Sequence, residues 1–324
     1  IQLCLNVYKK HKNVCIVVLG DLGRSPRMQY HAMSFAKEGY TVDFIGYPGS
    51  LPLKEIRENS SIHIFYLHPP PDIEDRLSRL PYYVIKTIWQ TSNLIWILFT
   101  KHISNYILIQ NPPAIPTILV CWFYSIAVDS KFIIDWHNYA HTLMALSLKD
   151  DHLLVKFAKA IETYFGSKAH YNFCVSQAMK EDLQLKWGIK LLRYYMIDHQ
   201  MNFMKNIIED YPKMLASADL GICLHISSSG LDLPMKIIDM FGCELPVCAY
   251  NFKCLSELVK HKENGMIFSN YKELAEQLKS WFEDFPNNDI QHQLDKKFRE
   301  ELHKFQKNRW HGNWSSIALP YFNQ

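Results

Sequence analysis

The chain has 324 residues, of which 48% are hydrophobic and 14% aromatic, and its formal net charge is +3. This length predicts about two domains, each large enough to bury a core. The nearly balanced charge, without a basic patch interleaved with aromatic residues, excludes nucleic acid as an expected partner. The eight cysteines include no CxxC pair, which argues against a zinc site and for a reducing compartment.

The first residues combine an apolar stretch with positive charge. Ile1–Tyr8 (IQLCLNVY) is followed by a basic run at residues 9–12. The apolar stretch is far shorter than the roughly 18 residues that a membrane-spanning helix needs. A basic flank after an apolar segment is typical of the cytosolic end of a membrane anchor. Residues 1–12 are thus interpreted either as the end of such an anchor or as a frayed basic terminus.

Residues 13–190 alternate between strand-like stretches and helical or turn-rich ones. The six expected strands are buried runs at Val14–Leu19, Thr41–Ile45, Ile62–Leu67, Tyr106–Gln110, Phe132–Asp135 and Tyr171–Val175. After the first strand, Ser25-Pro26 is a typical helix start, and apolar residues at helical spacing continue to about Lys37. This alternation predicts a Rossmann-like α/β domain whose parallel sheet is covered on both faces.

Pro81–His102 is a strongly apolar stretch within this domain. It contains Trp89 and Trp96, but Lys86 and a polar run at residues 90–93 interrupt it. The interruptions favour a helix at the protein core or at a membrane interface. Of these two, a buried helix that covers the sheet is the preferred interpretation, and membrane contact is the alternative.

The most informative stretch is Ser227–Asp239 (SSSGLDLPMKIID), which follows an expected strand at Asp219–Leu224 and enters an expected helix at Pro234–Gly242. Proline suits the first helical turn, where its missing N–H would be unpaired anyway. The unpaired N–H groups and partial positive charge of a helix N-terminus form an anion site, and Lys236 adds a charge for a phosphate. An ordinary Ser-rich connection capped by Asp232 is the alternative interpretation.

Residues 211–324 have the pattern of the second half of another α/β domain. The remaining expected elements are a helix at Pro212–Ser217, a strand at Pro246–Ala249, a helix at Cys254–His261, a strand at Met266–Phe268 and helices to about residue 307. Between Trp187 and Tyr211 no strand–helix pattern appears. The sequence therefore predicts an irregular junction at 191–210 and a partial C-terminal domain at 211–324, with one strand-rich half absent.

Six blocks of sequence are similar to one enzyme family: GDLGRSPRMQYHA (20–32), QNPPAIP (110–116), IDWHNY (134–139), SADLGICLH (217–225), SSSGLDLPMKIIDMFGC (227–243) and NFKCLSELVKHKENG (251–265). They resemble the chitobiosyldiphosphodolichol β-1,4-mannosyltransferases, which are GT-B glycosyltransferases, and the resemblance covers nearly all of the chain. It implies a GT-B-like fold, with a Rossmann-like acceptor domain at 13–190 and an incomplete Rossmann-like donor domain at 211–324.

The resemblance implies an inverting enzyme that transfers mannose from GDP-mannose to GlcNAc2-diphosphodolichol for N-glycosylation. The implied partners are GDP-mannose, the dolichol-linked diphosphate acceptor and a membrane, with other transferases of the dolichol pathway as further expected partners. The implied location is the endoplasmic reticulum membrane, with the catalytic part facing the cytosol. No cofactor is expected, because GDP-mannose is a substrate. No metal site is expected either, although a divalent cation such as Mg²⁺ is compatible with the reaction.

Six residues of the 227–243 block are expected to bind the donor: Ser228, Ser229, Gly230, Asp232, Lys236 and Asp239. Mannosyl transfer requires stabilisation of the departing diphosphate. The chain has no Asp-x-Asp motif for a metal, so the loop serines, the helix N-terminus and Lys236 are expected to do this. The resemblance assigns the ribose to Asp239, whereas Asp232 either caps the helix or contacts the mannose.

Transfer also requires a base at the acceptor hydroxyl. His137 is the first candidate because imidazole titrates near physiological pH, and a contact to the donor phosphate or a purely structural role are its alternatives. Asp135 is either a second candidate base or the group that orients His137.

The acceptor is expected to bind at a glycine loop after the first strand, with the residues Gly20, Gly23, Arg24, Ser25 and Arg27. Arginine suits bidentate contacts to a diphosphate, and a plain Rossmann-like turn is the alternative. The GxGxxG spacing is absent, which argues against a dinucleotide.

One departure from the family affects the functional prediction. Family members carry a longer middle segment that supplies the first strands and a phosphate-contacting loop of the donor domain. Here the chain passes from the acceptor domain almost directly to the block that begins at Tyr211. The sequence therefore supports two functional predictions: an active mannosyltransferase, and a truncated, inactive homologue that binds other transferases of the pathway.

Overall fold

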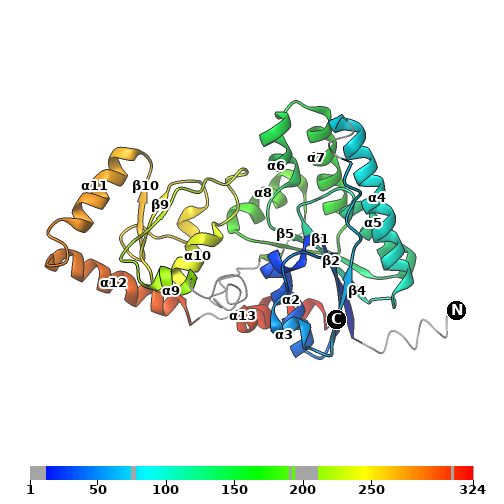
Figure 1. Cartoon of the computed structure of the whole chain (residues 1–324), viewed down its shortest axis with the longest axis horizontal. Helices are drawn as coiled ribbons and strands as arrows, with labels where there is room; N and C mark the ends of the chain where they lie inside the picture. The colour runs from blue at the N-terminus through cyan, green and yellow to red at the C-terminus, as the bar shows by residue number, and fades with distance from the viewer. Residues whose placement is uncertain (1–11, 74–77, 190–191, 194–210, 308–309, 324) are drawn as a thin grey trace. The chain divides into compact units, whose positions relative to one another are not determined.

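The computed structural model describes residues 12–73, 78–189, 192–193, 211–307 and 310–323. The chain forms two compact units. Unit 1 consists of Ile1–Cys174, Asp182–Leu192 and Pro320–Gln324, and unit 2 of Val175–Glu181 and Arg193–Leu319. Each unit contains a parallel sheet with helices packed against it (Figure 1).

The sheet of unit 1 has seven strands in the order β3-β2-β1-β4-β5-β6-β7. They are β1 (Asn13–Asp21), β2 (Thr41–Tyr47), β3 (Ile62–Tyr66), β4 (Tyr106–Asn111), β5 (Lys131–Trp136), β6 (Tyr171–Cys174) and β7 (Leu192–Arg193). The first six strands pair in parallel, as predicted from their buried apolar runs. The sequence did not predict β7, because two residues are too few for a recognisable pattern.

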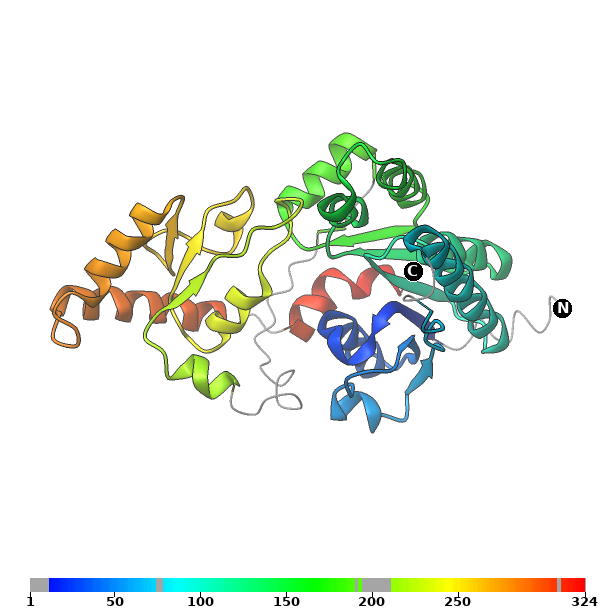
Figure 2. The same ribbon diagram turned by 45° about the horizontal axis from the view of Figure 1, so that its top comes forward.

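The helices of unit 1 cover both faces of this sheet (Figures 1 and 2). They are η1 (Leu22–Arg24), α2 (Pro26–Lys37), α3 (Lys54–Arg57), α4 (Arg79–Thr100), α5 (Thr117–Val128), α6 (Ala140–Leu148) and α7 (Leu153–Gly166), followed by η5 (Leu319–Tyr321) near the C-terminus. The neighbouring pairs α4 and α5, α5 and α7, and α7 and α6 form one layer. Strand β1 lies between β2 and β4, where the order of the strands reverses. In open α/β sheets, ligands bind at the carboxyl ends of the strands near such a point.

Helix α4 corresponds to the apolar stretch predicted at Pro81–His102. Its Leu94 and Leu98 are buried, and the helix packs against α5. The same helix leaves Ile88 and Trp96 largely exposed, however, so it is not a buried helix throughout. Within the described part of the chain, no helix combines the length and the apolar character needed to cross a bilayer.

Unit 2 has a smaller parallel sheet in the order β10-β9-β8. Its elements are α9 (Tyr211–Ala216), β8 (Gly221–Cys223), α10 (Met235–Gly242), β9 (Val247–Tyr250), η4 (Leu255–Glu257), β10 (Met266–Phe268), α11 (Tyr271–Phe282), α12 (Asp289–Phe305) and α13 (Trp310–Ile317), while α8 (Gln177–Trp187) is divided between the units. Ile237, Phe241, Val247 and Leu302 form the centre of its core. In the part of the chain that the structure describes, β8 pairs with β9 alone.

The helix predicted at Cys254–His261 is wrong, because only the short turn η4 forms there. The side chain of Asn264 accepts the N–H of Lys260 at 2.7 Å and donates to the carbonyl of Leu258 at 3.1 Å. These backbone groups would otherwise continue a helix. The side chain of Asn264 thus competes with helix formation, although the apolar residues of this segment have helical spacing.

Two further predictions fall on residues outside the described ranges. The possible anchor lies in residues 1–11, with Lys12 at its end, and most of the predicted junction lies in residues 194–210. The domain bounds drawn from the sequence, including the bound at residue 190, stay predictions.

Candidate functional site

A buried carboxylate, Asp135, is the centre of a polar cluster at the end of β5. Arg27 Nη2 pairs with Asp135 Oδ1. Asp135 Oδ2 lies 3.3 Å from His31 Nε2 and 2.9 Å from His137 Nε2. Arg27 and His31 are four residues apart on α2, so both reach the same side of that helix. The cluster therefore joins the first helix of unit 1 to the carboxyl end of β5.

The charges of this cluster follow from burial and from its pairing. Burial alone would raise the pKa of Asp135, but Arg27 and the histidine hydrogen bonds hold that pKa well below its usual value. Burial lowers the pKa of His137 and of His31, and Asp135 opposes this shift only partly. Near pH 7 the carboxylate is therefore ionised and both imidazoles are neutral.

The proton on His137 can be placed by chemistry. An ionised carboxylate only accepts hydrogen bonds, so His137 Nε2 carries the proton that Asp135 binds. The lone pair of the neutral ring is then on Nδ1. The side chain of His137 is 24% exposed, whereas those of Asp135 and His31 are fully buried. This geometry supports a base at His137 Nδ1 and an orienting role for Asp135.

The guanidinium of Arg27 forms an ion pair within unit 1. Its side chain is buried and paired with Asp135, although the sequence suggested a contact with the acceptor diphosphate. Sequence reasoning could not reveal this ion pair, because its partners are 108 residues apart. The diphosphate contact of Arg27 stays a prediction.

The glycine loop after β1 is a tight turn held by Asp21. Asp21 accepts the N–H of Gly23 and the N–H of Ser50, each at 2.9 Å. A Cβ on Gly23 would lie 2.2 Å from the Ser50 carbonyl oxygen, so this close approach requires glycine. The side chain of Arg24 is 77% exposed, and its Nε lies 3.2 Å from Ser50 Oγ. Arg24 is thus the accessible cation of this loop.

Gly20 and Ser25 complete the predicted acceptor residues. Gly20 lies in β1, directly before Asp21. Ser25 is at the N-cap position of α2, but its hydroxyl donates to the Asp21 carbonyl at 3.1 Å and does not cap the helix. Both residues therefore shape the turn from which Arg24 extends.

In the loop before α10, which the sequence predicts to bind the donor and which we call the donor loop, the carboxylate of Asp232 lies beside two serine hydroxyls. Ser227 Oγ donates to Asp232 Oδ1, and Ser229 Oγ lies 3.4 Å from the same oxygen. Gly230 has a φ of +70° and donates its N–H to Ser227 Oγ at 2.9 Å. The predicted helix cap at Asp232 is wrong, because α10 has Pro234 at its N-cap and no side-chain cap bond. The carboxylate of Asp232 instead accepts the hydroxyl of Ser227.

Lys236 and Asp239 lie on α10, three residues apart, and Ser228 lies half-buried in the loop before it. Lys236 is exposed in the first turn. Asp239 is partly buried, and burial raises its pKa to about 6. Because residues three apart are neighbours on a helix surface, this cation and this acid share one side of α10.

We expect Asp239 to make stability depend on pH. The folded protein holds the Asp239 proton to about pH 6, whereas the unfolded chain releases it near 3.8, so the folded state binds more protons between these values. The free energy of unfolding should therefore fall as pH rises from about 4 to 6. Asp239→Asn should remove this fall and raise the Tm at pH 7. Thermal unfolding of both proteins from pH 4 to 8 checks this, and a Tm difference independent of pH would contradict it.

A second buried acid, Glu162 of α7, was not singled out from the sequence. It accepts hydrogen bonds from Asn111 Nδ2, the N–H of Ala140 and His141 Nδ1, each at 2.7 Å. The cluster joins the end of β4 to the start of α6, next to His137 in sequence. Glu162 is the one acidic residue of α7 and follows the buried Ile161, which was the signal that could have revealed it. No group of three or more His, Cys, Asp or Glu side chains in the described ranges could hold a metal ion.

Comparisons with known proteins agree with the resemblance seen in the sequence. A family model described as glycosyl transferases group 1 matches residues 168–284. The chain is 34% identical to the chitobiosyldiphosphodolichol beta-mannosyltransferases of Pongo abelii and of Homo sapiens, over 95% of this chain and 92% of each relative. These alignments extend over 431 residues, more than the 324 of this chain, so the relatives contain internal residues without a counterpart here.

A solved structure shows the same fold. Sucrose-phosphate synthase from Thermosynechococcus elongatus superposes with a TM-score of 0.63, over 97% of this chain and 98% of that chain, at 12% identity. The predicted GT-B-like fold is confirmed by this likeness and by the parallel sheets of both units. The chain therefore belongs to the chitobiosyldiphosphodolichol β-mannosyltransferase family of GT-B glycosyltransferases.

Proposed function

We propose that the protein transfers mannose from GDP-mannose to GlcNAc2-diphosphodolichol, with inversion and a β-1,4 linkage, in lipid-linked oligosaccharide synthesis for N-glycosylation. The observation that carries this proposal is the 34% identity, over 95% of the chain, to relatives named for this mannosyl transfer. The proposal includes the location inferred from the resemblance, at the endoplasmic reticulum membrane with the catalytic part facing the cytosol.

His137 supplies the base in this proposal. Its Nδ1 accepts the proton of the attacking acceptor hydroxyl, while Asp135 binds the Nε2 proton and stabilises the imidazolium that forms. Because Arg27 keeps Asp135 ionised, Asp135 orients the ring and does not take the proton itself. The accessible Arg24 is the cation of unit 1 that binds the acceptor diphosphate.

The donor binds through unit 2 in this proposal. The departing GDP carries its new negative charge on the diphosphate, so amide groups and a cation placed there lower the barrier. Ser228, Ser229 and the first turn of α10 supply the amides, and Lys236 supplies the cation. Gly230, whose own N–H donates to Ser227 Oγ, gives the loop its path through a positive φ. Asp239 accepts hydrogen bonds from the ribose hydroxyls once it is ionised. Its high pKa therefore predicts weaker GDP binding below about pH 6.

The test of this function is an acceptor-dependent transfer assay. Purified protein is incubated with GDP-mannose carrying labelled mannose and a short-chain GlcNAc2-diphosphate lipid, and product and GDP are quantified together. We expect one β-linked mannose per GDP released, and no GDP release without acceptor. A folded protein that binds both substrates but forms no product would contradict the function and leave the inactive homologue.

Lys236→Ala is expected to weaken GDP binding by about ten- to hundredfold, the effect of losing a hydrogen bond from a charged group. Isothermal titration calorimetry with GDP measures this change. Lys272→Ala is a matched control, because Lys272 is likewise exposed at the second position of a helix, α11. Equal affinities of the two variants would show that Lys236 does not contact the phosphates.

A further inference from the structure

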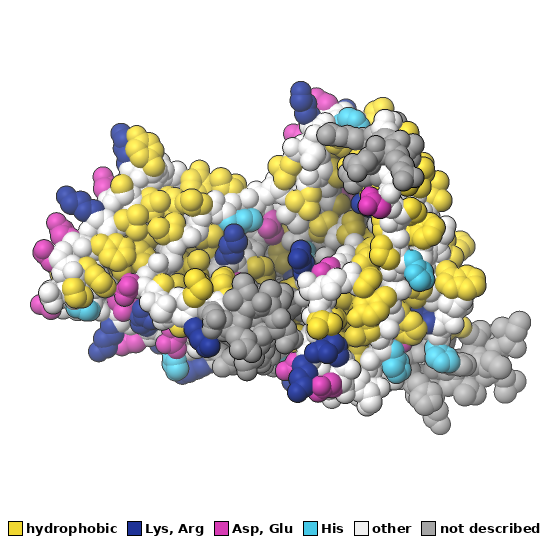
Figure 3. Space-filling model, in the orientation of Figure 1, with side chains coloured by type: hydrophobic (Ala, Val, Ile, Leu, Met, Phe, Trp, Pro, Cys, Tyr) yellow, Lys and Arg dark blue, Asp and Glu magenta, His cyan; other side chains and the backbone are white. Residues whose placement is uncertain are grey.

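Among the described residues, Asp135 and Glu162 are the two acids whose side chains have no exposed surface. Figure 3 shows Asp and Glu side chains, in magenta, at the surface of the face that it draws, where water solvates them. A buried carboxylate persists only with hydrogen-bond donors around it. One donor of Asp135 is His137 itself. Glu162 takes its donors from the end of β4 and from the start of α6, shortly after His137.

Both carboxylate oxygens of Glu162 accept hydrogen bonds. Oε1 accepts Asn111 Nδ2 and the N–H of Ala140, each at 2.7 Å, and Oε2 accepts His141 Nδ1 at 2.7 Å and the N–H of His141 at 3.1 Å. A carboxylate accepts on both oxygens, whereas an amide would turn its NH2 group against two of these donors. The N-cap residue of α6, Tyr139, makes no side-chain cap bond, so Glu162 caps this helix from α7.

The segment 137–141, which begins with His137, is fixed against the end of β4. The N–H of His137 donates to the Asn111 carbonyl at 2.8 Å, and Asn111 Nδ2 donates to the Asn138 carbonyl at 3.2 Å. Two residues later the chain reaches the donors of Glu162. The backbone that carries His137 is therefore held by Asn111 at its start and by Glu162 at its end, while Asp135 holds the ring.

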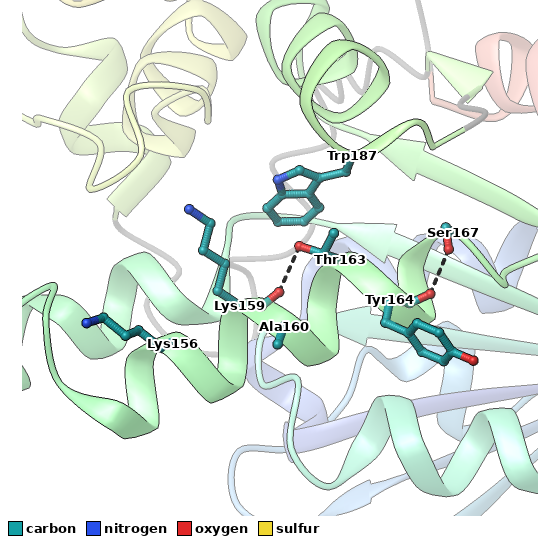
Figure 4. A pocket seen from close by; sticks show the side chains of 7 residues that line it. All are labelled: Lys156, Lys159, Ala160, Thr163, Tyr164, Ser167 and Trp187. Carbon is teal, nitrogen blue, oxygen red and sulfur yellow. Dashed lines mark hydrogen bonds between the residues drawn. The ribbon is translucent and has the colours of Figure 1, made fainter.

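Glu162 is directed away from the outer surface of α7. Figure 4 shows that surface, where Lys159, Thr163 and Ser167 line a pocket of about 500 Å³ together with Trp187. Glu162 does not line this pocket, and it shares the opposite side of the helix with the buried Ala158, four residues earlier. Its four hydrogen bonds all go to Asn111 and to the start of α6. An effect of Glu162 on the reaction must therefore pass through the segment that it holds.

We propose that Glu162 is a positioning residue for His137. By accepting hydrogen bonds from Asn111 and from the first turn of α6, it keeps residues 137–141 in one backbone path. His137 Nδ1 thereby stays where the acceptor hydroxyl is deprotonated. The inference rests on the proposed function, because it takes His137 as the base. The alternative is a helix cap without a role at His137, which predicts a loss of stability that has no connection to that residue.

A double-mutant cycle in the whole chain separates these two explanations. Glu162→Gln keeps the size of the side chain but places an NH2 group against the donors. At saturating substrates it should lower turnover by about 10- to 100-fold, the effect of misplacing a reacting group by about 1 Å. In the His137→Ala background the same change should lower turnover by no more than about twofold, because no base is left to misplace. The affinity for GDP should stay that of the wild type in both backgrounds.

Glu257→Gln is the matched control for the loss of a helix cap. Glu257 of η4 likewise accepts the first two N–H groups of a helix, those of Gln177 and Ala178 in α8, at 2.7 and 2.8 Å. These residues belong to unit 2 and make no printed contact with the segment 137–141. The factor by which Glu257→Gln changes turnover should therefore be the same with and without His137.

Circular dichroism establishes that each variant is folded at the assay temperature. If Glu162→Gln does not fold, Asn111→Ala replaces it in the cycle, since this change removes the bonds to Asn138 and Glu162 and keeps those between Glu162 and α6. The same dependence on His137 is expected. Equal factors with and without His137, in a protein whose wild type forms product, would overturn the positioning role alone. A wild type that forms no product would overturn the proposed function together with this inference.

Discussion

Replacement of His137 by alanine is expected to lower turnover by about 10²–10⁴-fold, the usual contribution of a general acid–base group. Since Asp135 binds Nε2 of His137, the lone pair of the neutral ring is on Nδ1. The side chain of His137 is also partly exposed, whereas those of Asp135 and His31 are fully buried. The affinity for GDP should stay unchanged, because in our proposal the donor binds through unit 2. Steady-state transfer rates at saturating GDP-mannose and calorimetry with GDP measure the two effects.

The pH dependence of turnover separates a base from a structural histidine. Because burial lowers the pKa of His137, the rising limb of the wild-type profile should lie below pH 6.5, the ordinary value for histidine. In His137→Ala this limb should disappear. His63→Ala is the control, since His63 is 54% exposed on β3 and has no proposed role. Turnover that is unchanged in His137→Ala would remove His137 from the mechanism.

Asp135→Ala is expected to lower the free energy of unfolding by about 3–5 kcal/mol, the range for breaking a buried ion pair by removing one partner. The change leaves the guanidinium of Arg27 buried without its carboxylate, and His31 and His137 lose their shared acceptor. Urea denaturation of the variant and the wild type measures the difference.

A double variant tests the cause of this loss. Arg27→Met combined with Asp135→Ala removes both charges, so its stability should exceed that of Asp135→Ala alone. A double variant less stable than Asp135→Ala would show that the unpaired charge of Arg27 is not the cause of the loss.

Asp135→Asn tests whether Asp135 orients His137, because an amide can donate to His137 Nε2 and thereby move the ring proton to Nδ1. The turnover of this variant should fall as much as that of His137→Ala.

Most of the fold of unit 1 could be predicted from local pattern. Buried β-branched runs such as Val14–Leu19 identify parallel strands, and each of the six predicted strands forms.

The elements that the sequence predicted wrongly or missed have local causes. At Cys254–His261 the side chain of Asn264 takes the backbone groups that a helix needs, and β7 is too short to have a pattern.

The candidate site could be predicted only in its contiguous parts. Asp135 and His137 are two residues apart, so their chemistry is visible in the sequence. His31 and Arg27 are more than 100 residues from Asp135, and nothing local indicates that they meet it. In the donor loop the residue types were informative, but the hydrogen bonds that Asp232 accepts from the serines depend on the backbone path of Gly230.

The three-stranded sheet described in unit 2 is consistent with the small number of residues that the chain has between β7 and α9. Residues 194–210, between β7 and α9, are fewer than the roughly 30 residues that one βαβ unit needs. The relatives align over more residues than this chain has, so they contain internal sequence that is absent here. Among the described residues, the proposed donor site therefore consists of the loop before α10, α10 itself and the sheet of β8, β9 and β10. The binding of GDP by this reduced unit is the central claim of the proposed function.

Hydrogen–deuterium exchange with and without GDP tests this claim most directly. Amides within residues 228–236 should exchange more slowly when GDP is bound, because in the proposal those of Ser228, Ser229 and the first turn of α10 donate to its diphosphate. The slowing should be much weaker in Lys236→Ala at the same GDP concentration. Slower exchange confined to other segments, such as the turn at residues 20–25, or no change anywhere at saturating GDP, would contradict the account.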